Sequence, residues 1–435
     1  MEFSEKLAEL LTAYQRKDPE LSDWRFDLHE ARGLEVGMKN NRIGGPYSAP
    51  SYKRSISGEL YLIWKNQRFS SAKLDSQAIE NFGEYIPLWK AAAYHDPDGV
   101  GLYHPERLPE IDLFDQAVEQ IIDEQVNTPF QLLEMGLKRL ASAGFSKIDG
   151  KARCFVSQRS LLNSGGLRVG YSQSPVDFYF EVNSSYGESY QEKHWPEEER
   201  INRIIDNTAR VGNLLGKQAP PRPGGTIRLI FPPDLFEAFL NQFLLANLFG
   251  SLVINRQSRF SLLDFQERRP VMNSDLSLEV NTLLPWRAFS YICTSEGVPG
   301  GKIELITGGR LNTPLLSLKY AKKAGMPPTP VAAGGRGFFI RSRTPLSDWD
   351  TLIRESERAL IVYSVLGLHT QDSSSGSFSL TADQCLLVEN GVVLGKAKAV
   401  INGDFLGSLN QENSRLGRVD GEDNPGYAFL ASATF

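Results

Sequence analysis

The sequence is poor in the residues that usually hold metals or form disulfides. It has 3 cysteines and 5 histidines among 435 residues. Cys154, Cys293 and Cys385 are odd in number, far apart and without a CxxC pair, which predicts buried reduced thiols rather than disulfides or a zinc knuckle. Each half of a chain this long can bury a core without such support. Stability therefore gives no reason to expect a cofactor.

Long hydrophobic runs are also lacking. No stretch reaches the roughly 18 apolar residues that a membrane-spanning helix requires. The first residues, MEFSEKLAELL, mix acidic and apolar side chains and lack the basic run and apolar core of a signal peptide. We therefore expect a cytoplasmic protein with no membrane partner.

Charge of one sign does not accumulate along the chain. Lys and Arg number 47 and Asp and Glu number 52, so the formal net charge is 47 − 52 = −5. No segment collects five or six like charges, whereas nucleic-acid binding depends on a concentrated basic surface. The sequence therefore predicts no direct nucleic-acid partner.

The hydrophobic pattern that is present changes period along the chain. Apolar residues at helical spacing predict an amphipathic helix over residues 2–15. Trp24, Phe26 and Leu28 then alternate with polar residues, as in a half-buried strand, and the alternation resumes after a break expected at Gly33. The next expected elements are a hairpin turning at 65–67, helices opened by Asp75 and Thr128, strands within 153–183 and a helix over 196–215.

A Pro- and Gly-rich stretch at 218–225 is the expected domain linker, because its prolines stop the preceding helix and stiffen a connector. It predicts an N-terminal α+β domain at 1–217 and a C-terminal β-rich domain at 226–435. In the second domain, residues 233–250 predict the most apolar helix, and residues 346–366 a helix between short strands. The predicted fold class is α+β, two-domain, with mostly antiparallel sheets and packed helices.

The stretch HEARGLEVG, residues 29–37, begins with the two letters that open a zinc-peptidase helix. The residue four positions after His29 is Gly33, which cannot bind zinc and weakens a helix. In a strand, His29 and Glu30 point to opposite faces. We therefore expect His29 to share the polar face of a strand with Arg25 and Asp27.

The stretch YHDPDGVGLYHPE crowds His95, Asp96, Asp98 and His104 into one loop. Their spacing matches neither an EF-hand nor a zinc pattern. Asp-Pro-Asp-Gly commonly forms a turn, because aspartate accepts local N–H groups and glycine takes positive φ. A turn is the prediction here, and a metal site is the open alternative.

The stretch GLHTQDSSSGSFS places His369, Asp372 and Ser373 close together in sequence. A hydrolytic triad is assembled in space from separate elements, and the sequence lacks a GxSxG elbow. The prediction is a flexible loop of small residues. A loop whose amides contact a ligand or peptide is the open alternative.

Five segments, in the same order, resemble the TldD/PmbA family, whose members are known as modulators of DNA gyrase and as a two-subunit peptidase system. The resemblance covers nearly the whole length and implies the two-domain fold of that family. The segments are HEARGLEVGMKNNRI, SLLNSGGLRVGYSQSPVDFYFEV, NLLGKQAPPRPGGTIRLIF, EGVPGGKIELITGGRLNTPLLSLKYAKKAGM and SSSGSFSLTADQCLLVENG.

The family has two kinds of subunit. TldD-type subunits bind zinc through HExxxH on the helix after the linker and a cysteine near the carboxyl end, and TldE/PmbA-type subunits lack these residues. Here that helix reads DLFEAFLNQFLLANLF, and residues 395–435 contain no cysteine. The resemblance therefore implies a TldE/PmbA-type chain with no catalytic residue, no metal ligand and no cofactor of its own.

The resemblance also implies where a peptide is contacted. It places Glu296 and Arg336 in a cavity, and it makes a peptide-contact loop of His369, Asp372, Ser373, Ser375, Gly376 and Ser377. The sequence departs from the family at these places, with TSEGVPG, PPTPVAAGGRG and HTQDSSSGSFS. Such departures indicate a specialised paralogue, for instance one that serves a natural-product peptide.

These observations favour a non-catalytic subunit. It would dimerise through its carboxyl half with a TldD-type metallopeptidase and enclose an unfolded or natural-product precursor peptide, while the partner supplies the metal and its activated water. Two alternatives stay open. One is a homodimeric peptide-binding or scaffold protein without peptidase activity. The other is a divergent metallopeptidase with ligands from His95, His104 or His369.

Overall fold

The computed structural model describes residues 2–45, 48–331 and 336–435, which fold into two compact units. The first unit comprises Met1–Asp206, Thr282–Gly301 and Ser317–Val331, and the second comprises Asn207–Asn281, Lys302–Leu316 and Ala332–Phe435. The division into 1–217 and 226–435 around a linker at 218–225 stays a prediction.

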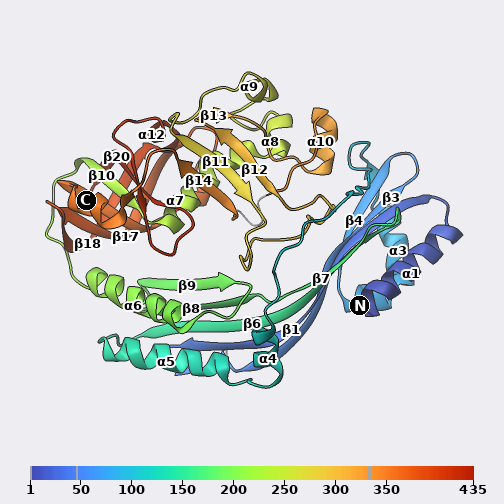
Figure 1. The fold of residues 1–435 in the computed structure, drawn as a ribbon, viewed down its shortest axis with the longest axis horizontal. Coiled ribbons are helices and arrows are strands. Elements are labelled where there is room, and N and C mark those ends of the chain that lie inside the picture. Colours follow the sequence, from blue (N-terminus) through green and yellow to red (C-terminus); the bar gives the residue numbers. More distant parts are fainter. Residues whose placement is uncertain (1, 46–47, 332–335) are drawn as a thin grey trace. The chain divides into compact units, whose positions relative to one another are not determined.

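The first unit is built on one long sheet with strand order β5-β4-β3-β1-β6-β8-β9, with β2 paired to β1 and β7 to β6 (Figure 1). Every pairing in this sheet is antiparallel. The strands are β1 (Leu21–Lys39), β2 (Arg42–Ile43), β3 (Ser51–Trp64), β4 (Arg68–Leu74), β5 (Tyr94–His95), β6 (Ile148–Asn163), β7 (Arg168–Gln173), β8 (Val176–Val182) and β9 (Tyr186–Glu192). The helices are α1 (Glu2–Lys17), α2 (Ser76–Glu80), α3 (Phe82–Ala91), α4 (Gln116–Asp123), α5 (Thr128–Ser142), α10 (Leu318–Ala324) and the beginning of α6 (Glu198–Leu215).

The central strand β1 is continuous, so the break expected at Gly33 is wrong. A Cβ atom at Gly33 would lie 2.2 Å from the carbonyl oxygen of Cys154 on the neighbouring strand β6. The glycine therefore marks a close approach of two backbones instead of the end of a strand. The expected face of His29 is confirmed, because its Nε2 lies 3.5 Å from Oδ1 of Asp27.

Most other predictions for the first unit are confirmed. The first helix forms α1, and the expected hairpin joins β3 to β4 through residues 65–67. Asp75 caps α2, since its side chain accepts a hydrogen bond from the backbone N–H of Ala78. The helix α5 begins at Thr128, but its N-cap residue is Asn127 instead of Thr128. The helix α4 was not predicted.

The second unit contains a seven-stranded sheet and a four-stranded sheet, in the orders β10-β16-β17-β18-β20-β19-β15 and β13-β12-β11-β14. The strands are β10 (Gly225–Phe231), β11 (Leu276–Asn281), β12 (Lys302–Thr307), β13 (Arg310–Leu311), β14 (Phe338–Ser342), β15 (Ser347–Asp348), β16 (Arg358–Leu366), β17 (Ser377–Glu389), β18 (Val392–Asp404), β19 (Arg415–Arg418) and β20 (Gly426–Thr434). The helices are α7 (Pro233–Phe239), the π-helix η1 (Leu240–Leu244), the 3-10 helices η2 (Leu245–Leu248) and η3 (Leu368–Thr370), α8 (Gly250–Ile254), α9 (Leu262–Gln266), α11 (Trp349–Arg354) and α12 (Phe405–Ser408).

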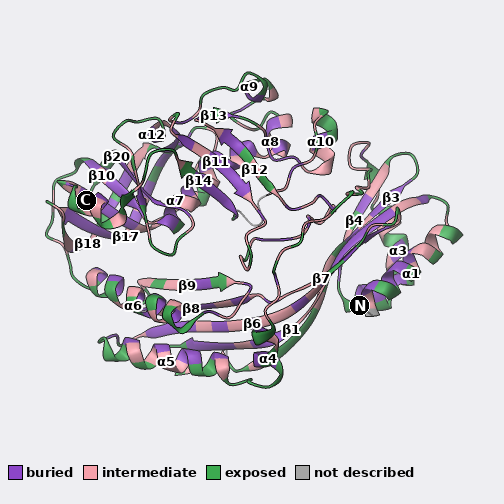
Figure 2. Cartoon of the chain, in the orientation of Figure 1, coloured by how far each residue is buried: buried purple, intermediate pink, exposed green. Residues whose placement is uncertain are grey.

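Five strands of the larger sheet close into a ring, because β10 pairs with both β16 and β20. The helical segment α7-η1-η2 contributes Phe236, Phe239 and Phe243 to the core of this unit, and all three are 0% exposed. The ring of Phe239 lies 4.6 Å from that of Phe231 on β10, between ring centroids. Figure 2 shows how buried residues follow the strands and the inward sides of the helices. The predicted class, α+β with mostly antiparallel sheet, is confirmed.

Two helix predictions in the second unit are wrong. Residues 346–366 form α11, which ends at Arg354, and then the strand β16. Successive residues of β16 from Ala359 to Val362 are all buried, as in a strand covered on both faces, and such a run cannot be told from a buried helix by periodicity. The predicted helix 233–250 is divided into α7, η1 and η2, and Gly250 begins α8 instead of ending a helix.

The three cysteines are free and buried, as predicted. Burial raises the pKa of the Cys154 and Cys385 thiols to about 12 and that of Cys293 to about 11, so none is a ready nucleophile.

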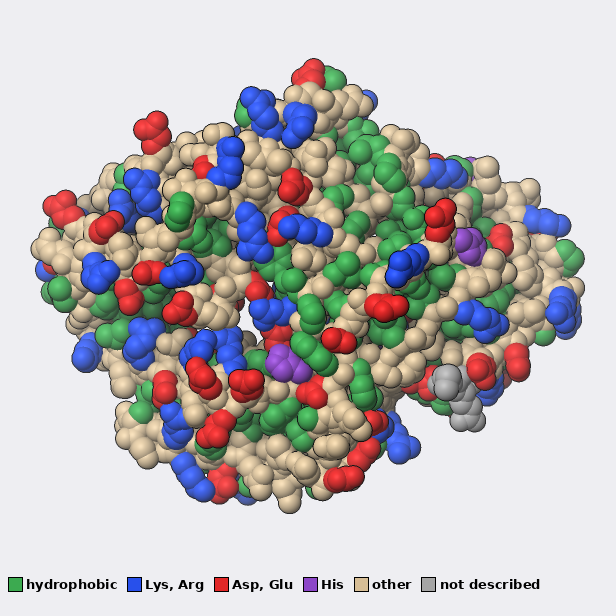
Figure 3. Space-filling view, viewed as in Figure 1, with side chains coloured by type: hydrophobic (Ala, Val, Ile, Leu, Met, Phe, Trp, Pro, Cys, Tyr) green, Lys and Arg blue, Asp and Glu red, His purple; other side chains and the backbone are tan. Residues whose placement is uncertain are grey.

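No helix in the described ranges is long and apolar enough to cross a membrane. On the face drawn in Figure 3, basic and acidic side chains are interspersed.

Candidate functional site

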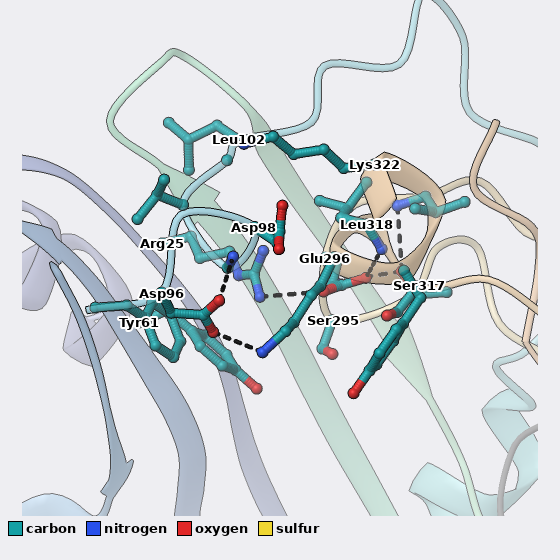
Figure 4. A pocket seen from close by; sticks show the side chains of 18 of the residues that line it. Arg25, Tyr61, Asp96, Asp98, Leu102, Ser295, Glu296, Ser317, Leu318 and Lys322 are labelled. Carbon is teal, nitrogen blue, oxygen red and sulfur yellow. Dashed lines mark hydrogen bonds and ion pairs between the residues drawn. The ribbon is translucent and has the colours of Figure 1, made fainter. Parts of the chain in front are cut away.

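A pocket of about 560 Å³ opens in the first unit (Figure 4). Its walls come from β1, β3, β4 and β5, from the loop after β5, from residues 294–298 and from the segment 317–331 that includes α10. All of these segments belong to the first unit. The long twisted sheet thus supplies one wall, and two segments far away in sequence supply the other.

The pocket holds an ion pair between Arg25 on β1 and Glu296. Nη2 of Arg25 lies 3.4 Å from Oε1 of Glu296, and the guanidinium carbon lies 4.2 Å from the ring centroid of Tyr61. The other carboxylate oxygen of Glu296 accepts a hydrogen bond of 2.8 Å from the backbone N–H of Leu318, the first residue of α10. Glu296, predicted from the family resemblance to line a cavity, is thus one of the residues that line this pocket. Its contact with a peptide stays a prediction.

A second ion pair joins α10 to the turn after β5. Nζ of Lys319 lies 2.7 Å from Oδ2 of Asp96, and the N–H of Gly99 donates to the other oxygen of Asp96 at 3.1 Å. Burial opposes ionisation of Asp96, but the hydrogen bond and charge of Lys319 and the backbone hydrogen bonds from Gly99 and Asp98 together outweigh it, so the pKa of Asp96 is lowered. Asp98 lies 3.7 Å from Lys323, and Lys322 donates to the carbonyl oxygen of Pro97 at 2.6 Å.

The predicted turn at Asp-Pro-Asp-Gly is confirmed by a hydrogen bond of 3.1 Å from the N–H of Gly99 to the carbonyl oxygen of Asp96. His95 on β5 and His104 in the following loop are both exposed. Among the residues that the structure describes, no three His, Cys, Asp or Glu side chains are grouped so that they could hold a metal ion.

Aromatic rings form one wall of the pocket. The rings of Tyr61 and Phe69 stack at 5.9 Å between centroids, and Phe69 meets Tyr94 edge to face at 6.0 Å. Tyr94 is 56% exposed, an unusual fraction for a large aromatic side chain. Tyr320 of α10 also lines the pocket.

The predicted peptide-contact loop lies in the second unit and is anchored to the helical segment α7-η1-η2. Nε2 of Gln242 donates to the carbonyl oxygen of Gln371 at 2.9 Å, and Nδ2 of Asn247 donates to that of Ser373 at 2.8 Å. Nη1 of Arg259 donates to the carbonyl oxygen of Ser375 at 3.0 Å. The loop therefore has defined contacts with this helical segment.

The side chains of this loop do not gather into a catalytic group. His369 lies on η3 and is exposed. The carboxylate of Asp372 accepts hydrogen bonds from the N–H and the hydroxyl of Ser374, and these bonds lower its pKa. Gly376 has φ +78°, and a Cβ atom there would lie 2.8 Å from the side chain of Leu406. Ser377 begins β17, and its N–H donates to Oγ of Ser375 at 3.1 Å.

Arg336 belongs to the second unit and is exposed, whereas Glu296 belongs to the first. Residues 332–335 of the divergent stretch PPTPVAAGGRG lie outside the described residues.

Burial raises the pKa of Glu237 on α7 to about 7, and the positive charge of Arg336 acts in the opposite direction. Sequence reasoning missed Glu237, whose carboxylate accepts a hydrogen bond of 2.8 Å from Nδ2 of Asn424.

The helical segment from Asp234 to Phe249 does not fit a zinc ion. Its inward side chains are phenylalanine and leucine, and its half-buried polar side chains include Asn241 and Gln242. Zinc in proteins is bound by cysteine, histidine and carboxylate groups. The only carboxylates of this segment are those of Asp234 and Glu237, and no histidine or cysteine accompanies them.

Comparison with known proteins finds one family match and several solved structures with the same fold. Residues 224–417 match the family PmbA/TldA metallopeptidase C-terminal domain. No curated protein matches the sequence. The fold is shared with TldE from Thermococcus kodakarensis, with a TM-score of 0.81 and 19% identity over 99% of this chain and 100% of that one.

Two further solved structures share the fold. A candidate modulator of a DNA gyrase from Thermotoga maritima has a TM-score of 0.79 and 18% identity over 99% of this chain and 100% of its own. A candidate modulator of DNA gyrase from Bacteroides thetaiotaomicron has a TM-score of 0.76 and 16% identity over 99% and 98%. The resemblance read from the sequence is confirmed, since residues 224–417 match the PmbA/TldA metallopeptidase C-terminal domain and the whole chain shares its fold with TldE and two candidate gyrase modulators.

Proposed function

We propose that the chain is a zinc-free, TldE-like subunit that pairs with a TldD-type metallopeptidase and binds peptide while the partner cleaves it. One observation carries the proposal. Within a match to a metallopeptidase C-terminal domain, the segment 233–248 packs apolar side chains into the core at the place where the catalytic kind of subunit is expected to carry HExxxH.

The packing of this segment supports a non-catalytic role. Phe239 contacts the rings of Phe231, Phe378 and Phe405, with centroid distances of 4.6 to 5.3 Å. Interiors are close-packed, so polar zinc ligands would not fit at such positions without a new arrangement of the core. The segment is therefore suited to core packing and not to metal binding.

The contribution of this chain is to position the peptide. The loop 371–377 is held by Gln242, Asn247 and Arg259 through its backbone carbonyl groups. That anchoring leaves the hydroxyl side chains of the loop, including that of Ser373, and the neighbouring imidazole of His369 to contact an extended peptide. The partner supplies the Lewis acid and the activated water. A divided site of this kind hydrolyses peptide only when both subunits are present.

The test uses the full chain with and without a TldD-type protein from the same organism. The chain alone is expected to bind zinc substoichiometrically and to leave an unstructured peptide intact. The mixture is expected to elute as a heterodimer, with about one zinc per heterodimer, and to cleave the peptide until a chelator is added. Hydrolysis together with stoichiometric zinc in the chain alone contradicts the proposal. A homodimer that binds peptide and ignores every TldD-type protein supports the scaffold alternative instead.

A further inference from the structure

We propose that the pocket of the first unit is a binding site for a terminal carboxylate attached to an aromatic or large apolar group, with Arg25 as its anchor. The C-terminal residue of a peptide and a single aromatic carboxylic acid share this chemistry. The site lies wholly in the first unit and needs no partner subunit, so it goes beyond the proposed role in peptide cleavage.

The first argument is the unused hydrogen-bonding capacity of Arg25. A guanidinium group has five N–H donors, and Arg25 is only 7% exposed. Within the part of the chain that the structure describes, Nε of Arg25 is buried without a hydrogen-bond partner, and Nη2 reaches Glu296 only at 3.4 Å. A buried charge with unsatisfied donors is costly. A ligand carboxylate in the pocket would accept from the terminal nitrogens of Arg25, because Nε itself is enclosed by protein atoms.

The second argument is that the carboxylates of the pocket are already engaged. Glu296 accepts from the N–H of Leu318 and faces Arg25, and Asp96 accepts from Lys319 and Gly99. Asp98 lies 3.7 Å from Lys323.

The cationic side chains of the pocket are less fully paired than its carboxylates. Lys322 donates to the carbonyl oxygen of Pro97 and has no carboxylate within ion-pair distance in the described residues. The lining has three cationic side chains and three carboxylates, so its charges balance, and the donors of Arg25 and Lys322 that lack a carboxylate partner are what favour an anion.

The third argument is the size and the wall of the pocket. Its volume of about 560 Å³ falls within the range of about 300 to 1,000 Å³ that is usual for small-molecule sites. Tyr61, Phe69 and Tyr94 form a continuous aromatic wall, and Tyr94 leaves more than half of its surface uncovered. Aromatic rings favour stacked or edge-to-face partners. The body of the ligand is thus expected to pack on this wall while its carboxylate meets Arg25 (Figure 4).

The test is a titration of the full chain by calorimetry with N-acetyl-L-phenylalanine and with its amide, N-acetyl-L-phenylalaninamide. These probes differ only in the charged group, so the comparison does not depend on how any variant folds. The acid is expected to bind at least about tenfold more tightly than the amide, because hydrogen bonds to charged groups are the stronger ones. A pentapeptide ending in phenylalanine, with a free or amidated terminus, distinguishes the two sources. Tighter binding of the free pentapeptide assigns the site to peptide termini, and tighter binding of the single residue assigns it to a small carboxylic acid.

Three variants complete the experiment. Arg25→Gln is expected to abolish the preference for the acid, and Tyr94→Ala to weaken both probes several-fold. Tyr52→Ala is the matched control, because Tyr52 is a comparably exposed tyrosine, 48% exposed, on β3 outside the pocket. Equal affinity for acid and amide overturns the proposal, as does the absence of binding of every probe at millimolar concentration. The proposal is also overturned if Tyr52→Ala weakens binding as much as Tyr94→Ala does.

Discussion

Asn247 connects the helical segment α7-η1-η2 to the loop 371–377, and its removal should weaken both. The side chain is 1% exposed. Its Nδ2 donates to the carbonyl oxygens of Phe243 and Ser373, at 2.8 Å each, and its Oδ1 accepts from the N–H of Arg259 at 2.7 Å. A net hydrogen bond contributes about 0.5 to 1.5 kcal/mol, and a buried group left unsatisfied costs about 1 to 3 kcal/mol. Asn247→Ala should therefore lower the free energy of unfolding by about 2 to 4 kcal/mol.

The assay is urea unfolding combined with hydrogen exchange. The exchange of loop amides should accelerate in Asn247→Ala more than that of β17, because the loop loses an anchor while the ring of strands stays intact. Asn410→Ala is the matched control, since Asn410 is exposed and its Nδ2 makes one hydrogen bond, of 3.1 Å, to the carbonyl oxygen of Val271. That change should cost less than about 1 kcal/mol. A loss below about 1 kcal/mol for Asn247→Ala, or normal exchange in the loop, refutes the reasoning.

Three further changes test the packing and the buried charge. Phe239→Ala should lower the free energy of unfolding in urea by about 3 to 5 kcal/mol, because the ring is fully buried. A loss near 1 kcal/mol contradicts the described core. Gly33→Ala should lower the free energy of unfolding by about 1 to 3 kcal/mol, since its Cβ would lie 2.2 Å from the carbonyl oxygen of Cys154. Gly170→Ala is the control and should be tolerated, because the nearest atom to its Cβ would lie at 3.6 Å. Burial raises the pKa of Glu237 from 4.5 to about 7, so the folded state binds the proton more tightly than the unfolded state. Its contribution to stability is complete below pH 4.5 and is lost as the pH rises through about 7, a change on the order of 3 kcal/mol. Glu237→Gln should flatten that pH dependence in unfolding measurements between pH 5 and 8, and an unchanged pH profile would show that another group is responsible.

Much of the fold could be predicted because local signals were clear. The alternation around Trp24 and Phe26 marks a strand whose one face is apolar, and the helical spacing at the start of the chain marks α1. The errors occurred where both faces of an element are buried. The run Ala359–Val362 is apolar throughout, so it has no period by which a strand differs from a helix. The π-helix Leu240–Leu244 has the sequence LNQFL, and nothing in that sequence distinguishes it from a turn of α-helix.

The pocket of the first unit could not be predicted as a site from the sequence. Arg25, Tyr61, Tyr94, Glu296 and Lys322 come from five separate segments, and nothing in their spacing shows that the sheet brings them together. Of these residues, only Glu296 was predicted to line a cavity, and that prediction came from the resemblance of its segment to the family. The alternation in β1 placed Arg25 on a polar face, but only the structure shows that this face is buried.

The most direct test of the central claim is the zinc content and peptidase activity of the purified chain, measured alone and after mixing with a TldD-type protein from the same organism. The account predicts substoichiometric zinc and no hydrolysis in the isolated chain, and chelator-sensitive hydrolysis by a heterodimer with about one zinc. Stoichiometric zinc with peptide hydrolysis in the isolated chain contradicts it.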